Sequence, residues 1–481
     1  VPGGSYLLPV PLIAANIDSQ SATCQIVAGG KRETLAWAEG FVAGGNPLRE
    51  QSEVEAPVVF VGYGVAAPEL GWDDYAGLDV RGKLVLAMRG APDRLPHDER
   101  AYYGETDTKR AAAAAHGAVG YLSVRRGGDA ESWQRLSRNA GKRPSTSWLE
   151  PDGTPHGAQA ALLVSAALSP FGLTALLAAA GRTPDALEAA AKEPGKGFAL
   201  GAALHLAYHS TIRRLESSNV AALLPGADPA LRRQVVVFSA HLDHLGEGAA
   251  VDGDAIYNGY YDNAMGCALM LETARTLATA RQRPRRSLLF LAVTGEEGGL
   301  LGSEELAFHP PAGLGPLVAD VNLDMPLFLY PVGDLVAYGS EHSSLQEPAT
   351  RAARAAGFTL SPDPMPEELV FVRSDQYAFV ERGIPAVYLM PGFRSLDPKV
   401  NGEAAFRNFL ETHYHQPSDQ QGLPVDWPSA LRFLQANALL GREIADADAP
   451  PQWNEGDFFG RRFGTRPAAA ESAPPARRIQ R

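Results

Sequence analysis

The spacing of apolar residues predicts different elements in the two halves of the chain. From residue 218 onward, short strands alternate with loops and helices, as in SNVAALLPG, QVVVFSAHLDHLG, a helix from Ala264, RRSLLFLAVTGEE and a further helix. The runs VVVFSA and LLFLAV are apolar at every position, which is typical of strands in a sheet that is covered on both faces. This alternation predicts a layered α/β domain with a mostly parallel central sheet.

Up to about residue 205 the pattern favours strands and turns. APVVFVGYGV and RGKLVLAMRG are short β-type runs that end in glycines, and TKRAAAAAHGAVGYLSV reads as a helix followed by a strand. Residues 161–181 carry no charge, but Ser169 and Pro170 form the N-cap and first position of a helix. We therefore expect a buried strand and a helix in this stretch, and no membrane span.

These patterns divide the 481 residues into four segments. We expect an N-terminal segment at 1–55, a β-rich domain at 56–205, the α/β domain at 206–445 and a tail at 446–481. The tail is rich in Pro, Ala, Gly and Arg and has few apolar residues, so we expect it to be flexible. Its arginines could bind an anionic surface, although a linker is the preferred interpretation.

Composition excludes several classes of protein. Hydrophobic residues make up 45% and charged residues 20%, as in a soluble globular protein. The net charge of −12 argues against nucleic acid or an anionic membrane as the main partner. We expect no disulfide between the two cysteines, Cys24 and Cys267, because Cys267 lies on an apolar helix face. The chain starts with Val and has no basic, apolar leader, so any targeting segment is expected to be removed or to lie outside this sequence.

Polar residues follow each of the buried strands. The five segments supply His241, Asp243 and His244; Asp262; Glu296 and Glu297; Asp324; and His413 and His415. Taken alone, each has an ordinary structural explanation, such as an N-cap or a loop histidine. Taken together, they would crowd several carboxylates at one sheet edge, which costs several kcal/mol for each unpaired buried charge. A metal site removes that cost.

The types of ligand narrow the choice of metal. Histidines and carboxylates without a thiolate suit Zn²⁺ in a catalytic setting, with Mn²⁺ or Co²⁺ as competitors, and disfavour a closed structural zinc site. There are more carboxylates than one ion needs. The sequence therefore predicts two divalent ions that share an Asp and together polarise a carbonyl and activate a water.

Six motifs then point to a family. AHLDHLG, YDNAMG, TGEEGGLLGS, NLDMP, RSDQYAF and HYHQPSD resemble those of the M28 metallopeptidases, in the family's order, across roughly residues 215 to 445. The resemblance implies a three-layer α/β/α catalytic domain of the zinc-peptidase type and hydrolysis of amino-terminal peptide bonds. It implies that His241, Asp262 and Asp324 bind one zinc ion, and that Asp262, Glu297 and His415 bind the other.

The resemblance also implies roles for residues that do not bind metal. Glu296 is expected to be the general base, and Asp243 to orient His241 through its second ring nitrogen. Tyr414 matches a position that in some members donates to the carbonyl oxygen. His244 and His413 match no ligand position, and we interpret them as supporting or loop residues. Tyr261 and Met265 depart from the usual residues beside Asp262, so they make the substrate preference uncertain.

Residues 60–90 and 109–124 resemble a protease-associated (PA) domain, which would wall the cleft and limit substrate length, or form only a structural lid. Members with PA domains are usually exported, so we expect a periplasmic or extracellular protein that acts on peptides. Three further interpretations stay open at this point: a carboxypeptidase using Arg373, Arg394 and Arg407, a one-zinc glutaminyl-cyclase-like enzyme, or a receptor-like protein without activity. The sequence says nothing about the oligomeric state.

Overall fold

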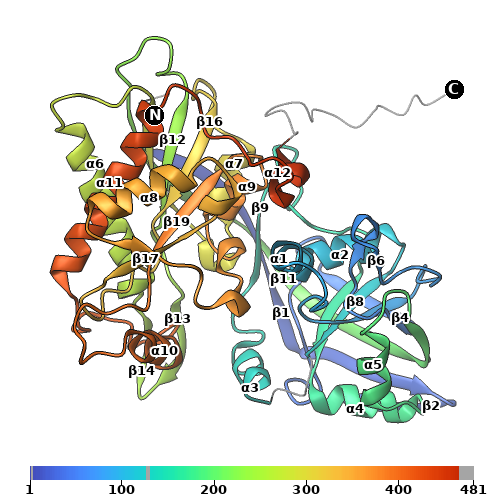
Figure 1. Ribbon diagram of the computed structural model, residues 1–481. Coiled ribbons are helices and arrows are strands. Elements are labelled where there is room, and N and C mark those ends of the chain that lie inside the picture. The colour runs from blue at the N-terminus through green and yellow to red at the C-terminus, as the bar shows by residue number, and fades with distance from the viewer. Residues whose placement is uncertain (2–3, 126–129, 465–481) are drawn as a thin grey trace, which may run out of the picture. The chain divides into compact units, whose positions relative to one another are not determined.

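The structure is a computed structural model that describes residues 1, 4–125 and 130–464, and it divides into two compact units (Figure 1). Unit 1 contains Val1–Leu8, Ser218–Gly246 and the chain from Tyr257 onward. Unit 2 contains Pro9–Ser217 and Glu247–Ile256. Among the described residues, no helix has both the length and the apolar character that crossing a membrane requires.

Unit 1 is built on a mixed, mostly parallel sheet. β12 (Val235–His241) lies at its centre and pairs in parallel with β15 (Ser287–Val293) and β16 (Leu317–Asn322). β16 continues in parallel to β19 (Ala386–Pro391). Antiparallel pairings join β19 to β17 (Asp334–Tyr338) and β15 to the end of β11 (Phe198–Leu224), and β18 (Thr359–Leu360) closes the edge beside β17. Every residue of β12 is buried, as the apolar run predicts.

Helices cover both faces of this sheet, which confirms the predicted layered α/β arrangement (Figure 1). On one face, Val237 and Leu289 contact a core that includes Leu306 and Phe379 of two short helices. On the other face, Phe238 stacks on Phe290, and a Cβ at Gly441 would lie only 2.0 Å from the Phe238 ring. The helices are α6 (Gly266–Ala278), α7 (Leu301–Phe308), α8 (Gln346–Ala355), α9 (Gln376–Val380), α10 (Gly402–Thr412), α11 (Trp427–Asp446) and α12 (Phe458–Phe463).

Most strands of unit 2 belong to the same hydrogen-bonded sheet, which passes through β11. Three neighbouring pairs are parallel, joining β4 (Gln51–Phe60), β7 (Leu84–Met88), β8 (Gly120–Val124) and β10 (Val164–Leu168) in that order. β3 (Phe41–Ala43) and β11 pair antiparallel at the two ends of this run. β1 (Leu7–Ala28) pairs with β11, β2 (Lys31–Leu35) and β9 (Ser145–Trp148), while β5 (Ala66–Ala67) and β6 (Trp72–Asp73) form a separate pair. The helices are α1 (His97–Gly104), α2 (Thr106–Ala115), α3 (Ala130–Asn139), α4 (Pro170–Ala179) and α5 (Pro184–Ala190).

The uncharged stretch at 161–181 forms the predicted strand and helix. β10 supplies the strand, and the Ser169 hydroxyl caps α4 by accepting a hydrogen bond from Gly172 N at 2.8 Å. Pro170 occupies the first turn, where its missing N–H costs nothing. The two cysteines are free thiols.

The unit boundaries differ from those expected at residues 56, 205 and 445. β1 begins in unit 1 and continues in unit 2, and β11 begins in unit 2 and ends in unit 1. The hairpin of β13 (Gly246–Val251) and β14 (Asp254–Tyr257) lies mainly in unit 2, although its sequence lies within the expected α/β domain. A change of composition cannot locate a boundary that falls within a single long strand.

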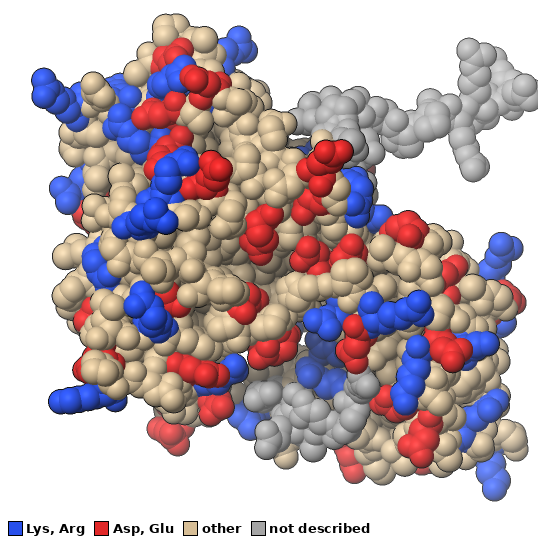
Figure 2. All heavy atoms as spheres, viewed as in Figure 1, with Lys and Arg blue, Asp and Glu red and all other residues tan. Residues whose placement is uncertain are grey.

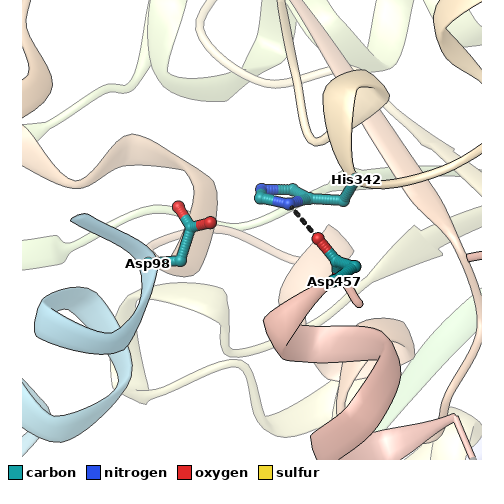
Figure 3. Close-up of side chains that lie close together, drawn as sticks. All are labelled: Asp98, His342 and Asp457. Atoms are coloured by element: carbon teal, nitrogen blue, oxygen red, sulfur yellow. Dashed lines mark hydrogen bonds and ion pairs between the residues drawn. The ribbon is translucent and has the colours of Figure 1, made fainter. Parts of the chain in front are cut away.

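Residues 447–464 are folded onto unit 1, whereas the sequence suggested a flexible tail. Phe459 of α12 is fully buried, and Trp453 Nε1 donates to Gly383 O at 2.9 Å. His342 contacts Asp457 at 2.8 Å (Figure 3); Asp98 in the same view is part of unit 2. The tail's mean composition conceals four aromatic residues within residues 453–463. The predictions for residues 465–481, including Arg466, Arg477, Arg478 and Arg481, lie outside the described residues.

Surface charge is mixed on each unit. In the face shown in Figure 2, Lys and Arg side chains are interspersed with Asp and Glu side chains on both units. This distribution is typical of a hydrated protein surface.

Candidate metal centre

The five predicted segments meet at one edge of the unit 1 sheet. β12 ends at His241, β15 is followed by the 3-10 turn Glu296–Gly298, and β16 is followed by Asp324. Because these strands run parallel, their carboxyl ends lie at the same edge. Asp262 comes from the irregular segment η3 (Tyr260–Met265), which precedes α6 and in which Asp262 has non-helical backbone angles. His415 comes from the turn after α10.

A first group of ligand-type atoms surrounds His241. Its Nε2 lies 3.2 Å from Oδ1 of Asp262 and 3.1 Å from Oδ1 of Asp324. All three residues are buried, and their ligand atoms lie close enough together to hold one metal ion.

A second group lies on the other oxygen of Asp262. Nε2 of His415 is 3.3 Å from Oδ2 of Asp262 and 3.1 Å from Oε2 of Glu297. His244 also belongs to this group, together with Asp262 and Glu297. Asp262 is thus the residue that the two groups share.

These separations fit divalent ions. Ligand atoms that bind one tetrahedral Zn²⁺ at about 2.0–2.1 Å lie about 3.3 Å from one another. The N···O separations of 3.1–3.3 Å in both groups match this value. The arrangement offers two sets of histidine and carboxylate ligands joined by Asp262, without a thiolate. Cys267 Sγ instead donates to the carbonyl oxygen of His241 at 3.1 Å.

The carboxylates and histidines of the two groups shift one another's pKa values. Burial alone would lower the pKa of His415, but Asp262 and Glu297 raise it to about 9. Burial would also lower the pKa of His241, but Asp324 and Asp262 outweigh this effect and raise the pKa well above its ordinary value. Conversely, although burial raises the pKa of Asp262, contacts with His241 and His415 hold it below its ordinary value. A metal ion must displace the protons that these histidines hold, so its binding weakens at low pH.

Glu296 differs from its neighbour Glu297. Burial raises the pKa of Glu296 well above its ordinary value, and Asp324 and Asp375 add to this effect while His241 opposes it. For Glu297, burial is outweighed by His244 and His415, which lower the pKa. Gly295 adopts a left-handed conformation (φ 72°) where the strand turns into the segment that carries both glutamates. Adjacent carboxylates therefore have opposite tendencies to hold a proton.

Asp243 contacts both neighbouring segments. The second ring nitrogen of His241, Nδ1, lies 2.9 Å from the main-chain oxygen of Asp243, so the orienting group is the backbone carbonyl. The Asp243 carboxylate accepts hydrogen bonds from Thr294 Oγ1 at 2.6 Å and Gly295 N at 2.8 Å. Asp243 thereby fixes the His241 ring and the start of the turn that carries Glu296 and Glu297.

Several supporting residues were not singled out from the sequence. Ser374 Oγ donates to Oδ2 of Asp324 at 2.6 Å, and Asn322 Nδ2 donates to Ser374 Oγ at 2.8 Å. Asp419 accepts hydrogen bonds from the main-chain N–H groups of Tyr261 and Asp262 at 3.0 and 3.1 Å. Ser374 and Asp419 lie inside the quoted motifs RSDQYAF and HYHQPSD, which was the signal that could have identified them.

A further support comes from outside the motifs. Asn219 accepts from Thr294 N at 3.0 Å and donates to Gly302 O at 2.8 Å, which ties together the two ends of the glutamate-bearing loop. Asn219 is fully buried. Its sequence context, SNVAALLPG, resembles any strand start, so pattern alone could not identify it.

Four other residues that the sequence singled out, Tyr414, His413, Tyr261 and Met265, have different surroundings. Tyr414 stacks on His415 with ring centroids 3.8 Å apart, and burial together with Asp262 raises its pKa. His413 contacts Ser418 Oγ at 2.9 Å. Tyr261 is fully buried and donates to Pro424 O at 2.6 Å, and Met265 is buried as well. Both side chains therefore pack in the interior, and their effect on substrate preference stays a prediction.

Comparison with known proteins follows the same residues. Residues 219–440 match the model of peptidase family M28. The match covers most of unit 1 and includes every metal-ligand candidate in the two groups. The matched residues do not include the PA-like stretch of unit 2, so the resemblance there stays a prediction.

Individual relatives agree with this M28 match. The mouse protein described as aminopeptidase NAALADL1 is 31% identical over 141 residues, covering 28% of this chain and 17% of the relative. A probable zinc metalloprotease from Pyrenophora tritici-repentis is 42% identical over 73 residues, covering 15% of this chain and 16% of the relative. The chain thus spans only about a sixth of these curated relatives.

A solved structure extends the fold comparison beyond the matched segment. An aminopeptidase from Aneurinibacillus sp. strain AM-1 aligns with a TM-score of 0.50 and 20% identity, covering 91% of this chain and 84% of that chain. At this identity the likeness concerns the fold. It supports an M28 aminopeptidase-like α/β fold with a mostly parallel central sheet.

Proposed function

We propose that this protein is a metal-dependent exopeptidase that hydrolyses amino-terminal peptide bonds with two divalent ions, zinc being the expected metal. The observation that carries the proposal is the shared carboxylate. Oδ1 of Asp262 lies 3.2 Å from His241 and Oδ2 lies 3.3 Å from His415. One carboxylate placed between two sets of ligands is the arrangement that a pair of co-catalytic ions requires.

The proposed ligands are those implied by the M28 resemblance. His241, Asp262 and Asp324 would hold one ion, and Asp262, Glu297 and His415 the other. When bound, the ions would polarise the scissile carbonyl and lower the pKa of a water. The chain's own contribution is to hold these ligands at fixed positions, to exclude bulk water by burial and to supply a base.

Glu296 is the proposed general base. It adjoins the ligand Glu297 but belongs to neither ligand group, and burial raises its pKa, which helps it to hold the proton that a general base takes up. It would take a proton from the attacking water and pass it to the leaving amine. Bound cations would lower this pKa toward the working range. Tyr414, beside His415, would donate a hydrogen bond to the substrate carbonyl oxygen.

Replacing the base tests this proposal. Glu296→Gln should keep both ions and lose turnover by about 10²–10⁴-fold, because the amide cannot accept the proton. Metal content and hydrolysis of an aminoacyl anilide panel are measured on the same preparation, with and without a chelator and after metal is added back. Glu297→Gln is the matched control and should lose an ion. Unchanged turnover in Glu296→Gln would refute the role.

A carboxypeptidase would need arginines near the metal centre that are available to a substrate carboxylate, and each of the three candidate arginines has a local partner. Arg373 contacts Glu368 at 2.8 Å, Arg407 contacts Glu403 at 2.9 Å, and Arg394 donates to Gly333 O and Thr359. Each guanidinium is thus engaged locally. A substrate pair blocked at either the amino or the carboxyl end separates the two activities, and cleavage of the amino-blocked peptide alone would favour a carboxypeptidase.

A glutaminyl-cyclase-like enzyme and a receptor-like protein would differ from the proposed exopeptidase in metal content. The cyclase-like enzyme would hold one zinc ion, and a receptor-like protein would have no need of the buried acidic groups. We also propose that unit 2 is a PA-like domain and that the protein is exported, on the family resemblance alone.

A further inference from the structure

His244 has an environment that its assignment as a loop histidine does not explain. Its Nδ1 lies 2.7 Å from Oε1 of Glu297 and 3.8 Å from Oδ2 of Asp262. Only 5% of its side chain is exposed, against 35% for the side chain of His415. His244 is therefore the more deeply buried of the two imidazoles beside Glu297.

The buried atoms at this point lack hydrogen-bond partners. Among the described residues, neither ring nitrogen of His244 accepts or donates a hydrogen bond, and neither does Oε1 of Glu297. The two atoms lie at an ion-pair distance of 2.7 Å, but the contact does not have hydrogen-bond geometry. Buried polar atoms are nearly always paired, so an unpaired imidazole beside an unpaired carboxylate oxygen indicates a missing partner.

The backbone makes room for this imidazole beside Asp262. A Cβ on Gly259 would lie 2.7 Å from Cβ and Cγ of His244 and 2.2 Å from the carbonyl oxygen of Asp262. Gly259 also has a left-handed conformation, with φ at 67°. The close approach of His244 to the Asp262 segment therefore depends on the absence of a side chain at residue 259.

We propose that His244 binds the second metal ion through Nδ1, beside Asp262, Glu297 and His415. The inference rests on the proposed di-metal function and deepens it, because the M28 motif assigns no ligand role to this residue. The second site would then have two imidazoles and two carboxylates, whereas the first has one imidazole and two carboxylates. Because imidazole favours Zn²⁺ over Mn²⁺ or Mg²⁺, the second site should fill first with zinc.

Two substitutions separate a ligand from a hydrogen-bond donor. His244→Ala removes the side chain, whereas His244→Asn places an amide N–H near the position of the imidazole Nδ1–H but offers no nitrogen lone pair for a metal. His413→Ala is the matched control, because His413 lies near His415 in sequence and contacts Ser418. Stepwise zinc affinities are measured by competition with a chromophoric chelator, and the visible spectrum is recorded for the Co²⁺-loaded proteins.

We expect both His244 variants to lower the zinc affinity of the second site by at least ~100-fold. Removing a residue that only supports a ligand already lowers metal affinity by about 10–100-fold. The Co²⁺ spectrum should change equally in both, and the first ion should keep its affinity, which also reports that the fold is intact. His413→Ala should match the wild type. The inference is overturned if His244→Asn binds both ions with wild-type affinity and spectrum. A wild type that binds no zinc would instead refute the proposed function itself.

Discussion

Both units bury charged side chains, but the two sets have different partners. In unit 2, Asp74 accepts hydrogen bonds from the N–H groups of Tyr63 and Val65 and from Trp72 Nε1, all at 2.9–3.0 Å. Lys109 donates to the carbonyl oxygens of Met88 and Gly90. In the candidate metal centre of unit 1, carboxylate and imidazole atoms face one another, and several of them have no hydrogen-bond partner among the described residues.

The contrast shows that burial of charge does not by itself identify a functional site. Burial raises the pKa of Asp74 to about 6 and lowers that of Lys109 to about 7, so both perturbations are large. Yet both side chains have neutral hydrogen-bond partners, backbone groups and the Trp72 indole, which is the pattern of structural residues. The unit 1 cluster differs because its histidine and carboxylate atoms lie close enough together to bind a metal ion, and some of them make no hydrogen bond among the described residues.

The largest expected effect comes from the first ligand group. Asp324→Ala should lower the affinity for the first ion by more than ~100-fold, because the loss of a residue that only supports a ligand already lowers metal affinity by about 10–100-fold. Activity should fall together with the metal content. The fold should persist, because the substitution removes a carboxylate from a crowded acidic cluster. Metal analysis and circular dichroism measure the two quantities. If Asp324→Ala instead lowered the folded fraction while the folded protein kept its full metal content, Asp324 would be a structural residue and the account of this cluster as functional would be wrong.

Unit 2 should show the opposite response. Asp74→Ala should lower the free energy of unfolding by at least about 1–3 kcal/mol, because the buried N–H groups that donate to Asp74 lose their acceptor. Zinc content and kcat/KM of the remaining folded protein should not change. Asp79→Ala, at an exposed carboxylate that pairs with Lys83 on the surface, is the control and should leave stability unchanged. A change in zinc affinity in Asp74→Ala would contradict the distinction between structural buried charges in unit 2 and functional ones in unit 1.

The smallest expected effect is at Asp320, whose carboxyl group is fully buried. Burial raises the pKa of Asp320 well above its ordinary value, and its contacts are with Ser239 Oγ at 2.9 and 3.1 Å. A raised folded pKa gives stability that is present below the unfolded pKa and lost as the pH rises through the folded pKa.

Asp320→Asn removes this titration. The variant should therefore gain stability relative to the wild type as the pH rises, by at most about 1.4 kcal/mol per pH unit. Denaturant unfolding at a series of pH values measures the difference. A difference that stays constant with pH would show that Asp320 is ionised in the folded protein.

The sequence indicated that the metal-ligand candidates gather at one sheet edge, but it did not indicate where the chain passes between the two compact units. The apolar strands ending at His241 and Val293 placed His241, Glu296 and Glu297 at one sheet edge, since parallel buried strands share a direction. In contrast, β11 extends from one unit into the other, and no change of residue pattern marks the point where it does so. Local patterns determine elements, whereas unit boundaries depend on contacts between distant residues.

Supporting contacts were the least predictable part of the centre. The carbonyl oxygen of Asp243, which contacts His241, belongs to the backbone and has no sequence signature. Asn219 acts from a strand far away in sequence. His244 was noticed in the sequence, but the proposal that it is a ligand depends on its distance to Glu297 and on the absence of a hydrogen bond at its ring nitrogens, which no sequence pattern shows. The order of residues 447–464 depends on the burial of aromatic residues such as Phe459, which average composition conceals.

The most direct test of the account is a zinc count on the wild type and on Asp262→Ala. After dialysis against micromolar zinc, elemental analysis and native mass spectrometry should find two ions bound to each wild-type chain. They should find neither ion retained at wild-type affinity in Asp262→Ala, because both ions use this carboxylate. A wild type with one ion or none, or a variant that keeps two, would contradict the claim that Asp262 joins two metal sites.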